Sequence, residues 1–359
     1  MGNSFRENLI DKAIGEMKAG DDPIFIFGGA NLADKINIFL SVHGVKISGF
    51  LVNRKYWTEE YKERNGYPVY VFEDYLENHK CMLVVGFAGY SPDYIEPYKN
   101  NISKIYVLDF IGKLVLDGLD GTISQKFIED HSDRIDWLQN QLCDELSVKS
   151  LNDYIEQRMT GIYSKQYQDD QYFPSGIIHL CEQEVFVDCG AYHGETSMDF
   201  IERLHLQNID NYKSIVVIEA DAENAKIAEQ SLQGLPNVGI ISAGVWSVSK
   251  TLYMNSGKGD NSQISEEGTE CIQVKALDDV LEGKEATYIK LDVEGAEMEA
   301  LKGMKNTIMK YKPRLAVCLY HKVEDFIEIP EYIFSLRKDY KFYIRNHSPY
   351  GIETVLYAV

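Results

Sequence analysis

Apolar residues in the first third of the chain follow two alternating patterns. Over 1–20 they recur three and four positions apart, which predicts an amphipathic helix. The run IFIF at 24–27 predicts a short buried strand, and a helical pattern follows over 32–42. Later apolar runs that predict strands lie at 45–53, 82–87 and 104–110. Strands that alternate with helices predict a parallel α/β sheet, and we place this first domain at 1–120.

The pattern changes between residues 121 and 175. Acidic, amphipathic helical patterns occupy 127–146 and 151–159, and the sequence YFPSG at 172–176 ends them. We expect a helical connector over 121–175 that packs on the domain that follows.

A second series of apolar runs predicts a second α/β domain over 176–359. Its expected strands lie at 184–190, 214–220, 237–243, 286–293, 314–321, 341–347 and 353–359. The last two are separated by SPYG, a hairpin-type turn. A sheet that ends on an antiparallel strand is typical of the class I (Rossmann-like) methyltransferase fold, whereas a plain doubly wound sheet more often ends on a helix.

Composition narrows the class of protein. The chain is 45% hydrophobic and 26% charged, which favours packed domains over disorder. A formal net charge of -20 argues against a nucleic-acid partner. No apolar run approaches the roughly 20 residues that span a bilayer, and the first residues do not resemble a signal peptide. The six cysteines form no C-x-x-C pair, so we expect neither a zinc site nor disulfides, and a reducing cytoplasm fits best.

The sequence VFVDCGAYHGETS carries the strongest local signal. A buried strand reaches Asp188, a tight turn follows with Gly190 and Gly194, and a helix begins near Glu195 and Thr196. Such a strand–turn–helix unit holds a cofactor in the crevice beside it. The spacing G-x-x-x-G differs from the G-x-G-x-x-G of a dinucleotide site.

The acids around this turn suit a cationic cofactor. S-adenosylmethionine (SAM) carries a sulfonium and an ammonium group, so Asp188 and Glu195 are favourable there. The next strand ends at Glu219, whose carboxylate can accept two hydrogen bonds from a ribose diol. Ala243 and Gly244, at the end of the third strand, are expected to flank the adenine. The alternative role for each acid is helix capping, but acids at two successive strand tips favour a cofactor site.

The fourth strand, in TYIKLDVEGAEMEALKG, predicts where the chemistry takes place. Lys290 interrupts an apolar strand, where a lysine needs a partner. Asp292 and Glu294 follow it, and His321 ends the fifth strand at the same edge of the sheet. Methyl transfer to a hydroxyl needs an oriented acceptor and a base. We expect Asp292 and Glu294 to orient the acceptor and His321 to take the proton; the alternative for His321 is a structural turn histidine. These carboxylates could hold a divalent metal, but no spaced ligand set demands one, and whether a metal is used stays open.

VDCGAYHGET, IEAD, the LDD of VKALDDVL and IKLDVEGAEMEALKG together resemble the FkbM-type methyltransferases, from about residue 172 to the C-terminus. This resemblance implies SAM-dependent O-methylation, typically of hydroxyls on sugars or polyketide-like products. It implies cofactor contacts for Asp188, Gly190, Gly194 and Glu219. It also implies active-site roles for Asp292 and Glu294.

The first domain resembles the Rossmann-like N-terminal domain of bacterial sugar acyltransferases, through FIFGGANLADKINIFLSVHGVKISGFLVN and YPVYVFEDYLENHKCMLVVGF. That resemblance implies nucleotide-sugar binding near Gly28 and Gly29. The alternative is a packing domain whose glycines only form a tight turn.

These patterns predict a cytoplasmic two-domain methyltransferase that uses SAM and acts on a hydroxyl of a small-molecule or glycan acceptor, a nucleotide-sugar among the candidates. One alternative is a non-catalytic nucleotide-sugar-binding or scaffold protein with a vestigial SAM site. Another is an NAD-dependent enzyme, disfavoured by the missing G-x-G-x-x-G. The acceptor, the position methylated and the oligomeric state stay open.

Overall fold

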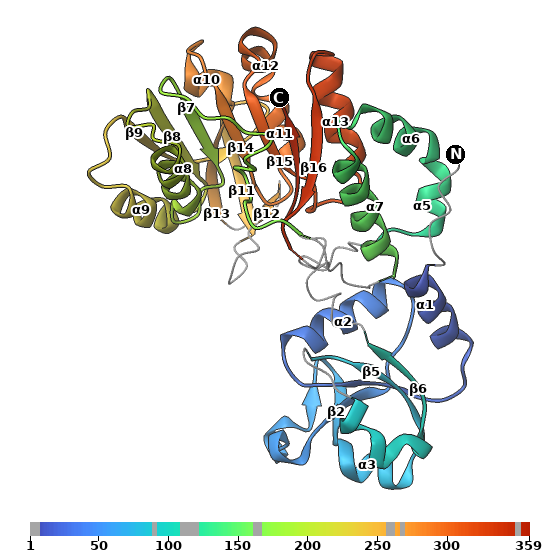
Figure 1. The fold of residues 1–359 in the computed structure, drawn as a ribbon. Helices are drawn as coiled ribbons and strands as arrows, with labels where there is room; N and C mark the ends of the chain where they lie inside the picture. Colours follow the sequence, from blue (N-terminus) through green and yellow to red (C-terminus); the bar gives the residue numbers. More distant parts are fainter. Residues whose placement is uncertain are drawn as a thin grey trace. The chain divides into compact units, whose positions relative to one another are not determined.

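The computed structural model describes residues 8–87, 92–107, 122–160, 167–255, 263–265, 270–348 and 353–359. The chain divides into two compact units (Figure 1). The first comprises the described residues of Met1–Asp130 and Ile155–Ser164, and the second those of His131–Tyr154 and Lys165–Val359. The predicted domain boundaries at 120 and 175 stay a prediction.

The first unit is built around a six-stranded sheet in the order β3-β4-β2-β1-β5-β6. All neighbours are parallel except β3 and β4, which pair antiparallel. The strands are β1 (Ile24–Phe27), β2 (Gly49–Val52), β3 (Glu63–Arg64), β4 (Tyr67–Val71), β5 (Cys81–Val85) and β6 (Ile102–Val107). The predicted parallel α/β sheet is therefore confirmed, although the apolar pattern did not predict β4 as a separate strand.

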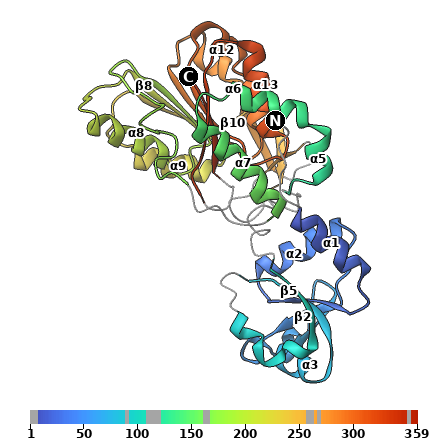
Figure 2. The same ribbon diagram turned by 45° about the vertical axis from the view of Figure 1, so that its right-hand side comes forward.

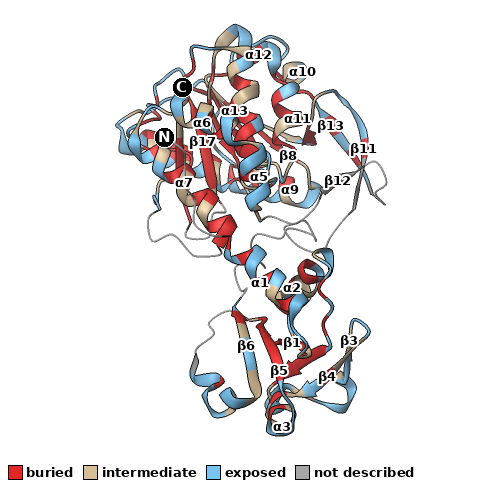
Figure 3. Cartoon of the chain, turned by 90° about the vertical axis from the view of Figure 1, so that its right-hand side faces the viewer, coloured by how far each residue is buried: buried red, intermediate tan, exposed pale blue. Residues whose placement is uncertain are grey.

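The helices of the first unit follow the amphipathic patterns. They are α1 (Leu9–Ala19), α2 (Asn31–Val42), α3 (Phe72–Asn78) and α5 (Gln125–Asp130), with short 3₁₀ turns η1 (Arg54–Tyr56), η2 (Glu59–Tyr61), η3 (Pro92–Tyr94) and η4 (Glu96–Asn101). Asn8 caps α1, because its side-chain oxygen accepts hydrogen bonds from the amides of Ile10 and Asp11 at 3.0 and 2.8 Å. Buried strands, shown red for β1 and β5 in Figure 3, form the core of this unit.

The second unit contains a seven-stranded sheet in the order β16-β17-β15-β14-β7-β8-β9. β17 pairs antiparallel with both β15 and β16, and the other neighbours are parallel. The strands are β7 (Val185–Cys189), β8 (Ser214–Glu219), β9 (Val238–Ser242), β14 (Tyr288–Leu291), β15 (Arg314–Cys318), β16 (Phe342–Asn346) and β17 (Thr354–Ala358). Every strand predicted for this domain is present, and the antiparallel final strand is that of the expected fold. The predicted turn at SPYG lies mostly in 349–352, outside the described residues.

Helices cover this sheet on both sides of its central strands. They are α8 (Glu195–Leu206), α9 (Ala222–Ser231), α10 (Leu277–Leu281), α11 (Glu297–Lys302), α12 (Lys305–Tyr311) and α13 (Asp325–Leu336). Figures 1 and 2 show α8 and α9 side by side near β8, and α12 beside α13 away from them. The central strands are almost completely buried, and Phe186 and Tyr288 pack with Phe200 of α8 in the core.

A smaller sheet between β9 and α10 was not predicted. Its order is β10-β13-β11-β12, formed by Gly244–Val245, Glu270–Lys275, Lys250–Asn255 and Gln263–Ser265. The apolar runs here are short and interrupted by polar residues, so the hydrophobic pattern contains no strong strand signal.

Two helices of the predicted connector belong at least in part to the second unit. α6 (Ser132–Gln141) lies against α13, where Arg134 forms an ion pair with Glu331 at 2.5 Å. The boundary between the units falls within α7 (Glu145–Thr160). Near its start, Ser147 accepts a hydrogen bond from the amide of Ile344, and Asp144 pairs with Arg345 at 2.6 Å. No helix among the described residues is long and apolar enough to cross a membrane.

Candidate active site

The turn after β7 requires glycine for a steric reason. Gly190 has φ of +77°, and a Cβ placed there would lie 1.6 Å from the carbonyl oxygen of Asp292. The backbones after β7 and β14 therefore touch at this point. Gly194, at φ +88°, precedes α8, which begins with Glu195 and Thr196. Glu195 is exposed and accepts a hydrogen bond from the amide of His193 at 3.1 Å.

Asp188 lies fully buried below this turn. Its Oδ1 is 3.2 Å from Lys290 Nζ, and its Oδ2 accepts a hydrogen bond from the hydroxyl of Ser197 at 2.8 Å. Lys290 Nζ also donates to the carbonyl of Gly190 at 2.5 Å. Burial by itself would lower the pKa of Lys290, but the charges of Asp188 and Asp292 raise it above its ordinary value. The buried ion pair of Asp188 and Lys290 thus holds the turn at Gly190 in place.

Glu219 ends β8 beside the same turn and is 8% exposed. Its two carboxylate oxygens accept hydrogen bonds from the amides of Tyr192 at 2.8 Å and Asp221 at 2.9 Å. Burial raises its pKa above the usual value, although these amide hydrogen bonds oppose the rise. Each oxygen keeps lone pairs for a further donor. Ala243 and Gly244 follow β9, both buried, and the amide of Ala243 donates to the carbonyl of Glu219 at 2.9 Å.

The structure brings Asp292, Glu294 and His321 together, as the sequence predicted from their places at one sheet edge. His321 Nε2 lies 3.6 Å from Asp292 Oδ1 and 3.4 Å from Glu294 Oε2. One ligand atom from each of the three residues lies within 4.8 Å of the others. The turn DVEGAE makes this approach possible, because Glu294 and Gly295 both have left-handed backbones, at φ +52° and +88°.

Glu297, the first residue of α11, lies on the other side of the imidazole. Its side chain is fully buried, and its Oε1 is 2.9 Å from His321 Nδ1 and 2.9 Å from the amide of Val293. In the sequence, Glu297 stands near Asp292 and Glu294 after the fourth strand, and the alternative role for it is a favourable charge at the start of a helix. Its distance from His321 could not be predicted, because it depends on how α11 packs against the end of β15.

Charges around the cluster shift two pKa values. Burial would raise the pKa of Asp292, but the charges of Lys290 and His321 and two tyrosine hydroxyls lower it below its usual value. Burial would lower the pKa of His321, but the charge of Glu297, contacts with Glu294 and the charge of Asp292 raise it well above its ordinary value. A histidine with a raised pKa holds its proton more tightly, so His321 is a weaker candidate for the group that takes the proton of the acceptor.

Two tyrosines that the sequence analysis did not select hold Asp292. The hydroxyl of Tyr172 donates to Oδ2 at 2.8 Å, and the hydroxyl of Tyr320 donates to Oδ1 at 3.1 Å. Tyr172 is buried, and its backbone adopts φ +65°. Its only signal in the sequence is the break at YFPSG, which says nothing of where the hydroxyl goes.

These residues fit SAM. The turn after β7 contains two glycines with left-handed backbones, Glu219 ends β8, and the carboxylates of Asp292 and Glu294 lie together after β14. A carboxylate with free lone pairs suits a ribose diol, and the negative surroundings favour a sulfonium and an ammonium group.

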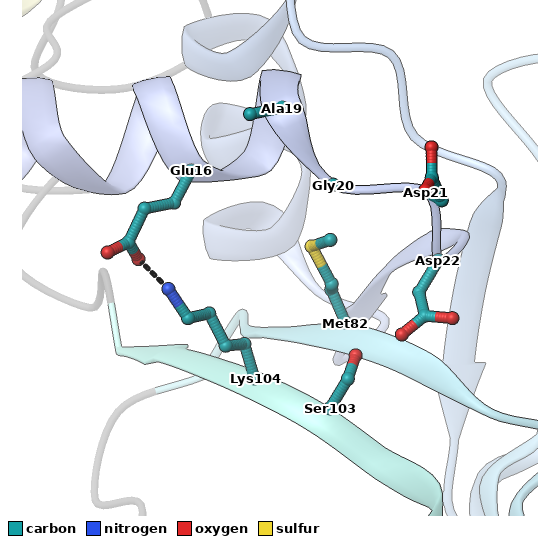
Figure 4. A pocket seen from close by; sticks show the side chains of 8 residues that line it. All are labelled: Glu16, Ala19, Gly20, Asp21, Asp22, Met82, Ser103 and Lys104. Carbon is teal, nitrogen blue, oxygen red and sulfur yellow. Dashed lines mark ion pairs between the residues drawn. The ribbon is translucent and has the colours of Figure 1, made fainter.

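The first unit contains a surface pocket of its own (Figure 4). It lies between the end of α1 and the first residues of β5 and β6, with Glu16 paired to Lys104 and with Asp21 and Asp22 at its rim. This is the amino end of the strands, opposite to Gly28 and Gly29, so the pocket is separate from the turn predicted to approach a nucleotide-sugar.

Comparison with known proteins adds the family. Residues 188–342 match the Methyltransferase FkbM domain. The structure resembles that of a methyltransferase FkbM from Methylobacillus flagellatus KT, with a TM-score of 0.75 and 19% identity over 99% of this chain and 94% of that chain.

Two further solved structures are less similar. An rRNA methylase from Streptococcus thermophilus is 14% identical over 50% of this chain and 87% of that chain, with a TM-score of 0.31. A fibrillarin from Aeropyrum pernix is 11% identical over 51% and 70%, with a TM-score of 0.31. No curated protein matches the chain.

The antiparallel final strand, the acids at the strand tips and the family match together define a SAM-dependent methyltransferase. The NAD-dependent alternative and the non-catalytic alternative are thereby set aside. Within that class, residues 188–342 of this chain match the FkbM methyltransferase domain.

Proposed function

We propose that the protein transfers the methyl group of SAM to a hydroxyl of a sugar or carbohydrate-linked acceptor. The observation that carries the proposal is the cluster of Asp292, Glu294 and His321 beside the glycine turn after β7. Hydroxylated acceptors need several hydrogen-bond partners, and this cluster offers carboxylate oxygens and an imidazole with tyrosine hydroxyls behind them.

The cofactor side of the site consists of the turn and the tip of β8. We assign Gly190, Gly194 and the first residues of α8, Glu195 and Thr196, to the walls of the cofactor crevice. The carboxylate of Glu219 accepts hydrogen bonds from the ribose hydroxyls of SAM, and Ala243 and Gly244 flank its adenine. Asp188 acts from beneath, because its carboxylate is engaged by Lys290 and Ser197 and holds the turn in place.

The acceptor side consists of the cluster. When bound, SAM supplies a methyl group activated by its positive sulfur. An acceptor oxygen aligned with the sulfur–methyl axis forms the new C–O bond with its lone pair while the C–S bond breaks, which leaves a neutral thioether. Asp292 and Glu294 orient that oxygen, and its proton leaves through the cluster to solvent. Alignment of this kind contributes about 7–11 kcal/mol to intramolecular reactions.

A direct test uses SAM with a ¹³C-labelled methyl group. The full chain is incubated with labelled SAM and a panel of free sugars and nucleotide-sugars, and products are separated by mass spectrometry. The expected product gains one labelled methyl group, with a ¹³C chemical shift typical of a methyl ether. A shift typical of N-methyl or S-methyl groups, or a panel without any product while non-carbohydrate hydroxyl compounds are methylated, would contradict the proposed acceptor.

A further inference from the structure

Both ring nitrogens of His321 lack a hydrogen-bond partner among the residues that the structure describes, and Nε2 faces two carboxylates. The side chain of His321 is 2% exposed, and its Nε2 makes no hydrogen bond to any residue that the structure describes. The same atom faces Asp292 Oδ1 at 3.6 Å and Glu294 Oε2 at 3.4 Å. These distances are too long for good hydrogen bonds, yet they place three ligand atoms within 4.8 Å of one another.

The other ring nitrogen, Nδ1, lies close to a buried carboxylate, although the geometry is not that of a hydrogen bond. Nδ1 lies 2.9 Å from Glu297 Oε1, and Glu297 in turn accepts the amide of Val293. A carboxylate at the second ring nitrogen is the usual support of a metal-binding histidine, because it fixes the ring and makes the free nitrogen a better ligand. In this structure Glu297 lies beside Nδ1 of His321, and Nε2 of the same ring faces the carboxylates of Asp292 and Glu294.

The carboxylate of Asp292 is oriented as well. Tyr172 donates to one oxygen and Tyr320 to the other, at 2.8 and 3.1 Å. Hydrogen bonds of this kind are typical around ligating carboxylates. Lys290 forms its ion pair with Asp188 at 3.2 Å, and none between Lys290 and Asp292 is present among the described residues, so the carboxylate of Asp292 is not neutralised by a direct ion pair with Lys290.

Glu294 completes the set from the solvent side. Its side chain is 44% exposed, whereas those of Asp292 and His321 are 22% and 2% exposed. An ion held by all three residues would therefore face the open side of the crevice. Three protein ligands leave further coordination positions free, which is the pattern of catalytic rather than structural metal sites.

We propose that Asp292, Glu294 and His321 bind one divalent transition-metal ion, of which Mn²⁺ is the representative probe. Two oxygens and one imidazole nitrogen suit an ion of this class better than Mg²⁺ or Ca²⁺, which prefer oxygen ligands alone. The inference rests on the proposed function in one respect: the free coordination positions are where the hydroxyl of the acceptor would approach. A hydroxyl beside a divalent cation loses its proton to solvent more readily. With Nε2 engaged as a ligand, His321 is a binding residue and not the base that the sequence suggested.

Metal binding is measured directly and without substrate. The full chain is freed of metal with a chelator, the chelator is removed, and Mn²⁺ is added while the electron paramagnetic resonance signal of the free aqueous ion is recorded. We expect the wild-type protein to take up one Mn²⁺ per chain. His321→Ala should weaken this binding at least about 10-fold, and Glu297→Gln should weaken it about 10–100-fold. His205→Ala, on the exposed side of α8, is the matched control and should bind as the wild type does.

Buried substitutions can disturb folding, so a second variant keeps the test decisive. Glu294 is partly exposed, and Glu294→Gln removes a ligand charge with little risk to the fold; Glu282→Gln is its exposed control. Weaker Mn²⁺ binding in Glu294→Gln, with circular dichroism unchanged, supports the site. If the wild type takes up no Mn²⁺, or if Glu294→Gln and His321→Ala bind it as tightly as their controls, the proposal is overturned.

Methyl transfer distinguishes this proposal from the proposed function. If the metal-free enzyme methylates sugars at the rate of the Mn²⁺-loaded enzyme, the metal proposal fails and the function stands. If Mn²⁺ binds at one site that depends on His321 while no sugar is methylated, the metal site stands and the proposed acceptor fails.

Discussion

The turn after β1 and the turn after β7 share the same local structure. Each follows the first strand of a largely parallel sheet, contains glycine in a left-handed backbone and leads into a helix. Gly28 has φ of +144°, and its Cβ would lie 2.6 Å from the carbonyl of Gly86. Gly190 has φ of +77° and a similar contact with the carbonyl of Asp292. In both units the glycine allows two strand ends to approach.

What differs is the chemistry at the neighbouring strand ends. In the second unit β8 ends on Glu219, and Asp292 follows β14. In the first unit β2 ends on Val52, and β5 is followed by Gly86. The topology provides a crevice in both places, but only the charged strand ends provide ligands for a cationic cofactor and a hydroxylated acceptor. Glycines at a strand end are therefore weak indicators of a binding site unless acids or bases accompany them.

The largest expected effect is that of Gly190→Ala. The added methyl group would clash with the Asp292 carbonyl in a backbone that disfavours side chains, so we expect about 3–6 kcal/mol of lost stability and no SAM binding. Denaturant unfolding and calorimetric titration measure both. Gly234→Ala, with φ of +90° and open space around its Cβ, is the control and should cost about 1 kcal/mol. Gly28→Ala should destabilise the first unit and leave SAM affinity unchanged. A loss of SAM affinity in Gly28→Ala would show that the turn after β1 also contributes to SAM binding.

Lys290→Met breaks the buried pair beneath the turn. It leaves the buried charge of Asp188 without its cation and with only the hydroxyl of Ser197 as a partner, and the loss of a cation costs about 3–5 kcal/mol in comparable cases. The double variant Lys290→Met with Asp188→Asn should recover part of that loss, because no lone charge remains. Lys226→Met removes an exposed ion pair with Glu223 and should leave the unfolding midpoint unchanged. Equal midpoints for Lys290→Met and Lys226→Met would show that the buried pair does not stabilise the turn.

Asp292→Asn tests the acceptor side alone. The variant keeps the shape of the side chain but loses the charge, and its amide nitrogen can no longer accept one of the two tyrosine hydrogen bonds. We expect turnover to fall about 10²–10⁴-fold, with SAM affinity close to that of the wild type. Single-turnover kinetics and calorimetry separate the two quantities. A variant that loses SAM affinity and turnover together would move Asp292 to the cofactor side.

Glu219→Gln should act on the cofactor side. It removes the charged acceptor for the ribose hydroxyls, so we expect SAM affinity to fall by about 1–3 kcal/mol while the fold persists. Glu223→Gln, four residues further along and exposed in α9, is the control. Glutamine can accept only one of the two backbone amides that Glu219 accepts, so unchanged SAM affinity in Glu219→Gln would show that neither the charge nor the second amide hydrogen bond is needed for SAM binding.

The smallest effect is expected from removal of residues 1–130, which form most of the first unit. A protein that begins at residue 131 keeps Asp144 and Ser147, which hold Arg345 and β16, and should bind SAM with wild-type affinity. A protein that begins at residue 150 lacks these contacts and should unfold at lower denaturant concentration. If the longer fragment folds but does not bind SAM, the first unit contributes to the site and the contrast between the two turns disappears.

Periodicity alone predicted most of the sheets. The strands of the second unit are long, continuous apolar runs separated by helical patterns, so their number and the antiparallel ending could be read from the chain. The insert β10–β13 and strand β4 were missed, since short strands of mixed polarity resemble loops.

For the site, the sequence alone determined which side chains stand at the strand tips, because the carboxyl ends of parallel strands meet at one edge. It also singled out Lys290 as a charge in need of a partner. Only the tertiary structure decided that this partner is Asp188 and that Tyr172 reaches Asp292 from 120 residues away. The same holds for Glu297 beside His321. These pairings depend on side-chain directions and on distances of a few ångströms between elements, which no spacing along the chain encodes.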